Sequence, residues 1–136
     1  MHVQRDDLIH PELCYKIIGV MYSVYNQLGS GHHEKYYQRA VAVGFQKENI
    51  RFCEQVMVPL VFNGVHIGRQ FLDFLVEGLV VVELKRGENF PASNITQINS
   101  YLRSTRLKLG ILVNFTTRGV KYRRIVNLED SYISKN

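Results

Sequence analysis

The chain has little of what would place it among membrane, secreted or disulfide-stapled proteins. No apolar run approaches the ~20 residues that cross a bilayer as a helix, and residues 1–7 contain no apolar signal region. Its two cysteines, Cys14 and Cys53, fit no metal-binding or redox spacing. We therefore expect free, reduced thiols in a cytoplasmic protein. Repeats, low-complexity tracts and linkers are also lacking.

Length and composition are typical of one ordinary folded domain. The 136 residues suffice to bury a core. We expect a single domain over 1–136, with its core at about 10–128 and a frayed tail at 129–136. The apolar fraction of 46% and charged fraction of 21% are usual for globular domains. The formal net charge of +5 favours a polyanionic partner only mildly, because many basic proteins of this size bind no nucleic acid.

Hydrophobic periodicity separates helices from strands along the chain. Apolar residues recur at helical spacing after Pro11 and stop at Gly29, which suits a helix end. Asn63-Gly64 is a strong signal for a two-residue hairpin turn. The expected helices are residues 11–28, 33–48 and 92–104. The expected strands are residues 51–62, 65–76, 79–85, 107–115 and 120–127.

This order predicts an α/β fold with a mixed sheet and helices packed against it. The first three strands follow one another closely and should pair antiparallel. The strand after residue 104 can add in parallel, because the preceding helix provides the crossover. Residues 107–115 are almost continuously apolar, which favours a strand covered on both faces.

Three charged residues, Asp73, Glu83 and Lys85, interrupt two strongly apolar strands. Unpaired buried charges are costly, so charge in such strands often has a function. Glu83 and Lys85 share a face by the two-residue alternation of a strand. The apolar neighbours should point the other way, into a core: Leu72, Phe74, Val76, Val80, Val82 and Leu84.

The position of Asp73 depends on the turn between these two strands. A three-residue loop at 76–78, with Gly78 left-handed, places Asp73 opposite Val81. Glu83 is then a same-face diagonal neighbour of Asp73, at roughly 7–8 Å. A two-residue loop at 77–78 would instead place the two acids on opposite faces.

Two carboxylates beside a lysine suit metal-assisted phosphodiester hydrolysis. Mg²⁺ binds a few carboxylates, keeps several waters and leaves room for a phosphate. Lys85 could orient an attacking water or offset charge on the phosphate. A glycoside hydrolase would need no adjoining lysine. From this triplet alone, a salt-bridged trio on a solvated strand face is an equally good interpretation.

Three motifs in this order resemble those of known nucleases. Asp73 followed by Glu83-Leu84-Lys85 resembles the PD-(D/E)XK signature, with Leu72 where a proline is usual. Residues 31–37 (GHHEKYY) resemble the motif that names the GxxExxY proteins, a small branch of that superfamily. Residues 94–102 (NITQINSYL) are similar to the Gln-x-x-x-Tyr helix of exonuclease-type branches. The resemblance spans about residues 10–128.

The resemblance implies a restriction-endonuclease-like fold and a role for each matching residue. Asp73 and Glu83 would be the principal metal ligands, with Glu34 as an extra acidic ligand or water-holding group. Lys85 would be the catalytic lysine. Gln97 and Tyr101 would form an orienting pair; they are four apart and so share a helix face. Asn94 stands where many members carry histidine.

We therefore expect a Mg²⁺- or Mn²⁺-dependent nuclease, with DNA preferred over RNA as substrate. Arg69 and Arg86 lie near the expected site, and Lys121 and Arg123 alternate on one strand face, as phosphate contacts require. A solvated basic surface explains these four residues equally well. The alternative is a non-catalytic nucleic-acid-binding or homodimeric assembly module, whose contact surface would be the first helix with its tyrosines Tyr15, Tyr22 and Tyr25.

Overall fold

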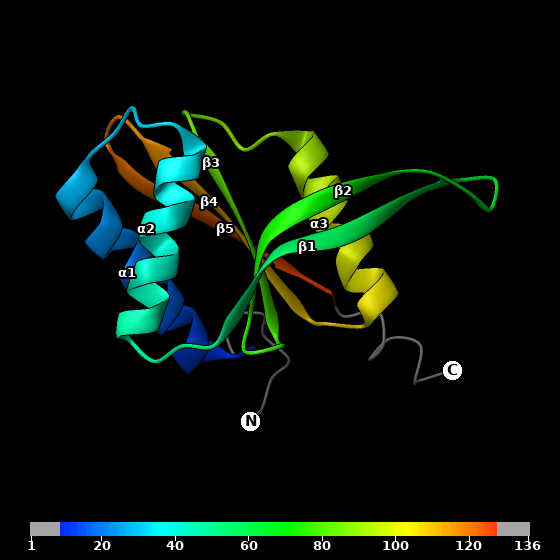
Figure 1. The fold of residues 1–136 in the computed structure, drawn as a ribbon, viewed down its shortest axis with the longest axis horizontal. Coiled ribbons are helices and arrows are strands. Elements are labelled where there is room, and N and C mark those ends of the chain that lie inside the picture. Colours follow the sequence, from blue (N-terminus) through cyan, green and yellow to red (C-terminus); the bar gives the residue numbers. More distant parts are fainter. Residues whose placement is uncertain (1–8, 128–136) are drawn as a thin grey trace, which may run out of the picture.

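A computed structural model describes residues 9–127, which form a five-stranded mixed sheet covered by three helices (Figure 1). The expected tail at 129–136 lies outside the described residues. The α/β class and the order of elements are as the sequence predicts. The helices are α1 (Pro11–Leu28), α2 (Glu34–Lys47) and α3 (Ala92–Thr105). The strands are β1 (Phe52–Phe62), β2 (Val65–Val76), β3 (Val80–Arg86), β4 (Leu109–Thr116) and β5 (Gly119–Val126).

The strands lie in the order β1-β2-β3-β4-β5. All neighbouring pairs are antiparallel except β3 and β4, which are parallel and joined through α3. The Asn63-Gly64 turn is confirmed, because Phe62 pairs with Val65. Within residues 9–127, none of the helices combines the length and apolar character that crossing a bilayer requires.

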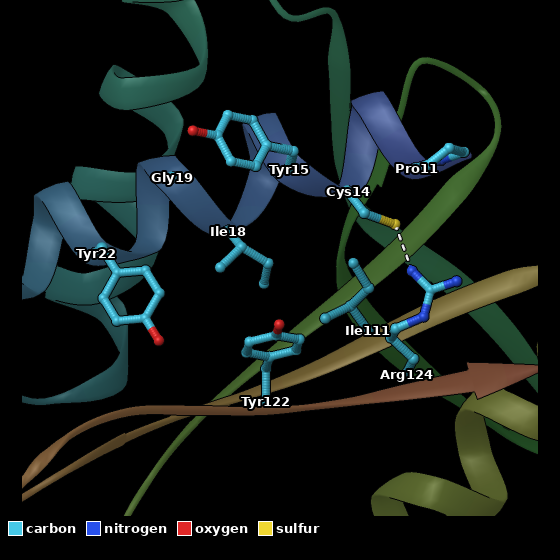
Figure 2. A pocket seen from close by; sticks show the side chains of 9 residues that line it. All are labelled: Pro11, Cys14, Tyr15, Ile18, Gly19, Tyr22, Ile111, Tyr122 and Arg124. Carbon is cyan, nitrogen blue, oxygen red and sulfur yellow. Dashed lines mark hydrogen bonds between the residues drawn. The ribbon is translucent and has the colours of Figure 1, made fainter. Parts of the chain in front are cut away.

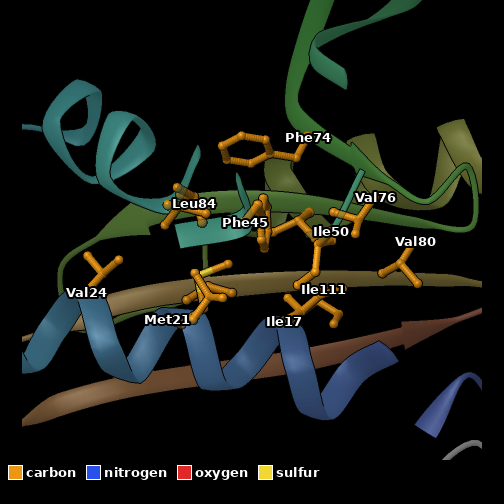
Figure 3. Close-up of a cluster of buried hydrophobic side chains, with 14 of the residues drawn as sticks. Ile17, Met21, Val24, Phe45, Ile50, Phe74, Val76, Val80, Leu84 and Ile111 are labelled. Carbon is orange, nitrogen blue, oxygen red and sulfur yellow. The ribbon is translucent and has the colours of Figure 1, made fainter. Parts of the chain in front are cut away.

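Two apolar clusters lie on opposite faces of the sheet. The larger one packs α1 and α2 against the sheet (Figure 3), and the smaller one packs α3 against the other face. All eight residues of β4 are buried, as expected for a strand covered on both sides. Gly110 permits the close approach of α3, since a Cβ at this position would lie 2.5 Å from Cγ2 of Ile98.

The hairpin joining β2 and β3 differs from the expected register by one residue. Its loop does contain three residues and Gly78 is left-handed (φ 67°), but the loop covers 77–79 and Val76 pairs with Val80. In the continued register Asp73 lies directly across from Glu83, not across from Val81. Leu72 also differs from expectation, because it packs in the α3 cluster while Phe74 packs in the α1–α2 cluster.

Candidate active site

The predicted acidic pair lies where β2 separates from β3. Backbone pairing of the two strands is confined to residues 74–76 and 80–82. Beyond that point, the Asp73 N–H donates to Oε1 of Glu83 at 3.0 Å. The Leu84 N–H donates to Oδ2 of Asp73 at 2.7 Å. Each carboxylate thus accepts a hydrogen bond from the backbone of the opposite strand. These side-chain bonds replace the backbone hydrogen bonds between β2 and β3, which stop at this point.

Burial and mutual repulsion make full ionisation of this pair costly. Glu83 is only 5% exposed, and burial, followed by the charge and hydrogen bond of Asp73, raises its pKa to about 8. Burial also raises the pKa of Asp73, against the opposing effect of the Leu84 N–H. Lys85 favours ionisation of both acids. Near neutral pH the pair therefore retains a proton unless further positive charge arrives.

Lys85 lies between the acids of two elements. Its Nζ is 3.5 Å from Oε1 of Glu34 and 4.0 Å from Oε2 of Glu83. Glu34 is the first residue of α2, where the helix dipole favours an acid, and its Oε2 accepts the Arg86 N–H at 3.4 Å. The structure thus brings together four predicted residues that are far apart in the sequence: Glu34, Asp73, Glu83 and Lys85.

The structure explains the spacing of Gly31, Glu34 and Tyr37 at the start of α2. Gly31 has a positive φ of 88°, which glycine adopts readily, just before α2 begins. Tyr37 is buried and stacks on Phe115, with ring centroids 4.2 Å apart. Its hydroxyl donates to the Gly29 carbonyl at 2.6 Å. Tyr37 therefore anchors the first turn of α2, and this turn carries Glu34 to Lys85.

Helix α3 supports Glu83 from the other side. Asn94 donates from Nδ2 to Oε2 of Glu83 at 3.1 Å and lies 3.5 Å from Oε1 of Gln97. Gln97 in turn donates to the Phe71 carbonyl at 3.2 Å. Tyr101 is buried one turn further along, in the α3 cluster, where burial raises its pKa. Gln97 thus lies in the hydrogen-bond network of the acids, whereas Tyr101 is part of the apolar packing.

Two residues that support the site were not expected from the sequence. Asn94 contacts Glu83 directly; the available signal was its place three residues before Gln97 on the same helix face. Asn114 is fully buried on β4, in register with Lys85. Its Nδ2 donates to the carbonyls of Gly87 and Asn89, which fixes the loop between β3 and α3. Its signal was a lone amide within an apolar strand.

The four expected phosphate contacts occupy different positions. Arg86 is exposed and donates to the carbonyls of Gly31 and His32 at 3.4 and 3.5 Å, so it also supports the start of α2. Lys121 pairs with Asn114, and Arg123 pairs with Leu112. Both are exposed and lie two strands from Lys85 and Glu83, about 10 Å away, on the α3 side of the sheet. Arg69 lies apart, on the distal part of β2.

The tyrosines expected on the first helix face away from the acids. Tyr15 is 83% exposed and, with Tyr22 and Tyr122, lines a cavity of about 580 Å³ between α1 and β5 (Figure 2). Arg124 at one end donates to Sγ of Cys14 at 2.9 Å. Tyr25 does not line this cavity; its hydroxyl donates to the Thr116 carbonyl at 2.7 Å and fixes α1 to the sheet.

The donor set at the acidic pair suits a hard divalent cation. Among residues 9–127, no three acidic, histidine or cysteine side chains form a metal site by themselves. Magnesium sites, however, often use one or two carboxylates, with water and substrate phosphate completing the shell. A cation beside Asp73 and Glu83 would also supply the positive charge that the two raised pKa values call for. The residues present therefore fit such an ion.

A mixed sheet with two helices on one face and one on the other, carrying an acid–acid–lysine cluster, defines a restriction-endonuclease-like domain. The model of the PD-(D/E)XK nuclease superfamily matches residues 11–125. The chain belongs to this superfamily, whose members act on nucleic acids.

Comparison with solved structures finds similar chains at low sequence identity. The chain is similar to the structure titled "Crystal structure of SSO0001", with 16% identity, a TM-score of 0.53 and coverage of 98% of this chain and 75% of that one. It also resembles an alkaline exonuclease from Laribacter hongkongensis, with 13% identity, a TM-score of 0.49 and coverage of 94% and 75%. No curated protein sequence matches the chain significantly.

Proposed function

We propose that this protein is a Mg²⁺- or Mn²⁺-dependent nuclease of the GxxExxY branch that hydrolyses DNA phosphodiester bonds. The observation that carries the proposal is the buried Asp73–Glu83 pair with the Lys85 ammonium group 4.0 Å from Oε2 of Glu83. A solvated salt-bridged trio would not bury Glu83 to 5% exposure or raise its pKa to about 8. The free thiols of Cys14 and Cys53 are consistent with a cytoplasmic enzyme.

Each residue then has a defined task. Asp73 and Glu83 would hold the cation, which when bound polarises the phosphate and lowers the pKa of a coordinated water. Lys85 donates hydrogen bonds to the attacking water or to the phosphate oxygens, where negative charge develops. Glu34 fixes Lys85 and accepts a hydrogen bond from the same water.

Further residues keep these groups in position. Asn94 orients Glu83 through its hydrogen bond to Oε2, and Gln97 orients Asn94. Tyr101 acts at a distance by packing α3 against the sheet. Lys121 and Arg123, on the same side of the sheet, and Arg86, beside Glu34, would contact the backbone phosphates of the substrate.

The test is cleavage of labelled linear, circular and single-stranded DNA and of RNA, each with Mg²⁺, with Mn²⁺ and with chelator. We expect metal-dependent cleavage of DNA by the wild type and none by Lys85→Ala. Lys47→Ala is the matched control, because this exposed lysine lies at the far end of α2 and should cleave as the wild type does. Equal rates for Lys85→Ala and wild type would refute the mechanism.

A non-catalytic nucleic-acid-binding module remains the contrasting outcome of the same experiment. Such a module would bind labelled DNA without cutting it under any metal condition. Its affinity would also be unchanged by Asp73→Ala, because binding alone needs no cation at this position.

A further inference from the structure

The distal halves of β1 and β2 form a two-stranded arm that projects from the body of the molecule (Figure 1). We define the arm as residues 56–72; its base packs on α3 through Val58 and Leu72, and the rest projects. On its β3 side, β2 has no strand partner among the described residues before Phe74. Residues 65–71 are all exposed. An isolated two-stranded hairpin is marginally stable in water, so such an arm calls for a partner.

The arm is unusually apolar for an exposed element. Half of the large apolar side chains exposed among residues 9–127 lie on it, seven of fourteen. They are Met57, Leu60, Val61, Phe62, Val65, Ile67 and Phe71. Counted over both faces of the ribbon, they expose on the order of 700 Å², against the ~800 Å² that each partner contributes to a standard-size interface. By the strand register, five of the seven lie on one face, namely Met57, Phe62, Val65, Ile67 and Phe71, and an exposed apolar patch of this kind marks an interaction site.

Charge identifies the class of partner. The arm carries one formally charged residue, Arg69, in a chain whose net charge is +5. Binding to a nucleic-acid backbone requires several lysine or arginine side chains, so the arm does not suit that partner. An acidic protein would likewise find only one cation. An uncharged apolar surface is complementary to another uncharged apolar surface, and the arm itself is one.

The two edges of the arm differ in their ability to pair. The outer edge, on β1, contains Pro59, which lacks an N–H and so discourages strand addition. The β2 edge at residues 65–70 contains no proline and has free backbone groups. At its inner end the edge is closed, because Gln97 binds the Phe71 carbonyl. An antiparallel contact between two such edges uses the same surface on both copies, as two-fold symmetry requires.

We propose that the arm is the dimerisation surface of this protein, with a second copy of the chain pairing along the β2 edge at residues 65–70. The arm joins the body at Asp73, so dimerisation would bring the two acidic sites into one assembly. The dimer is independent of cleavage and can be measured without metal or substrate.

Sedimentation equilibrium of the full chain tests the proposal. We expect the wild type to have twice the mass of one chain and Ile67→Glu to have the mass of one chain. Val43→Glu is the matched control, since this valine is an aliphatic residue on α2 with 55% exposure, against 61% for Ile67; it should remain dimeric. Tyr15→Glu, on the α1–β5 cavity, should also remain dimeric.

Hydrogen exchange supplies a second measurement that needs no variant. We expect the amides of residues 65–70 to exchange more slowly as the concentration of the wild type rises. A monomeric wild type, a dimeric Ile67→Glu or a monomeric Tyr15→Glu would each overturn the proposal. Exchange at residues 65–70 that does not change with concentration would also overturn it. A monomer whose DNA binding is lost on Ile67→Glu would instead assign the arm to nucleic acid.

Discussion

The two faces of the sheet make opposite use of the same strand. Val80, Val82 and Leu84 of β3 point into the α1–α2 cluster, whose buried members include no charged residue. The alternate residues face α3, where Val81 is followed by Glu83 and Lys85. The α1–α2 cluster has 18 buried members and the α3 cluster has eight. One face therefore supplies stability, which offsets the cost of burying carboxylates on the other face.

Substitutions on the α3 face should separate activity from stability most clearly. We expect Glu83→Gln to lower the cleavage rate by about 10³-fold or more, because the acidic pair then lacks one charge. At pH 9 the same variant should unfold at a higher temperature than the wild type, since the buried position 83 then carries no ionised carboxylate beside that of Asp73. Steady-state cleavage and thermal unfolding give the two readings. A variant that is both inactive and less stable would contradict this comparison.

Substitutions on the α1–α2 face should lower stability and leave the cleavage activity of the folded protein unchanged. Phe45 is fully buried and meets the ring of Phe74 edge-on, with centroids 5.3 Å apart. Phe45→Ala should lower the free energy of unfolding by about 3–5 kcal/mol, through lost burial and a cavity. The folded fraction should still cleave at the wild-type rate. Urea unfolding followed by circular dichroism measures the loss, and a change below about 1 kcal/mol would refute the division of roles.

The pH dependence of stability isolates the acidic pair. The pKa of Glu83 is about 8, above its ordinary value of 4.5, so the folded state binds this proton more tightly than the unfolded state. The resulting stabilisation is complete below pH ~4.5 and is lost as the pH rises through about 8. In chelator, we expect the free energy of unfolding to fall by a few kcal/mol over this range.

Two controls sharpen that measurement. In Glu83→Gln the free energy of unfolding should depend much less on pH, because glutamine does not titrate. Mg²⁺ should restore stability at high pH in the wild type alone, since it binds only the folded pair. An identical profile for the wild type and Glu83→Gln would show that another group is responsible.

The smallest expected effect concerns the loop between β3 and α3, which joins Lys85 to Asn94. Asn114→Ala removes the hydrogen bonds to the carbonyls of Gly87 and Asn89. It should cost about 1–3 kcal/mol of stability and lower kcat about tenfold or more through misplaced groups, with KM little changed. If the variant is destabilised but retains the wild-type kcat, Asn114 only stabilises the fold.

Local chemistry explains why most elements could be predicted from the sequence. Pro11 and Gly29 bound α1 as expected, because each has a strong backbone preference of its own. Asn63-Gly64 likewise determines its turn. The β2–β3 register was wrong by one residue because Leu79 is apolar and was assigned to a strand. In the structure it is the third loop residue, after Glu77 and Gly78, which both have positive φ.

The site was less accessible to sequence reasoning than the fold. The two acids, Lys85 and Glu34 were predicted, and the structure brings them together. The supporting roles of the Asn94 and Asn114 side-chain amides were not predicted, because these roles depend on contacts between elements that are distant in the sequence and not on a local pattern. The arm was also missed: its alternation predicts strands, but nothing local shows that β2 leaves β3 at Asp73.

Calorimetric titration of the wild type with Mg²⁺ and Mn²⁺ near pH 7.5, in buffers of different ionisation enthalpy, most directly tests whether the acidic pair holds a cation. We expect binding coupled to proton release, because the pKa of Glu83 is about 8 before the cation arrives. Asp73→Ala should bind the cation far more weakly than the wild type does, and Glu83→Gln should release no proton when the cation is added. Binding that is unchanged in both variants, or absent in the wild type, would show that these carboxylates do not form a metal site.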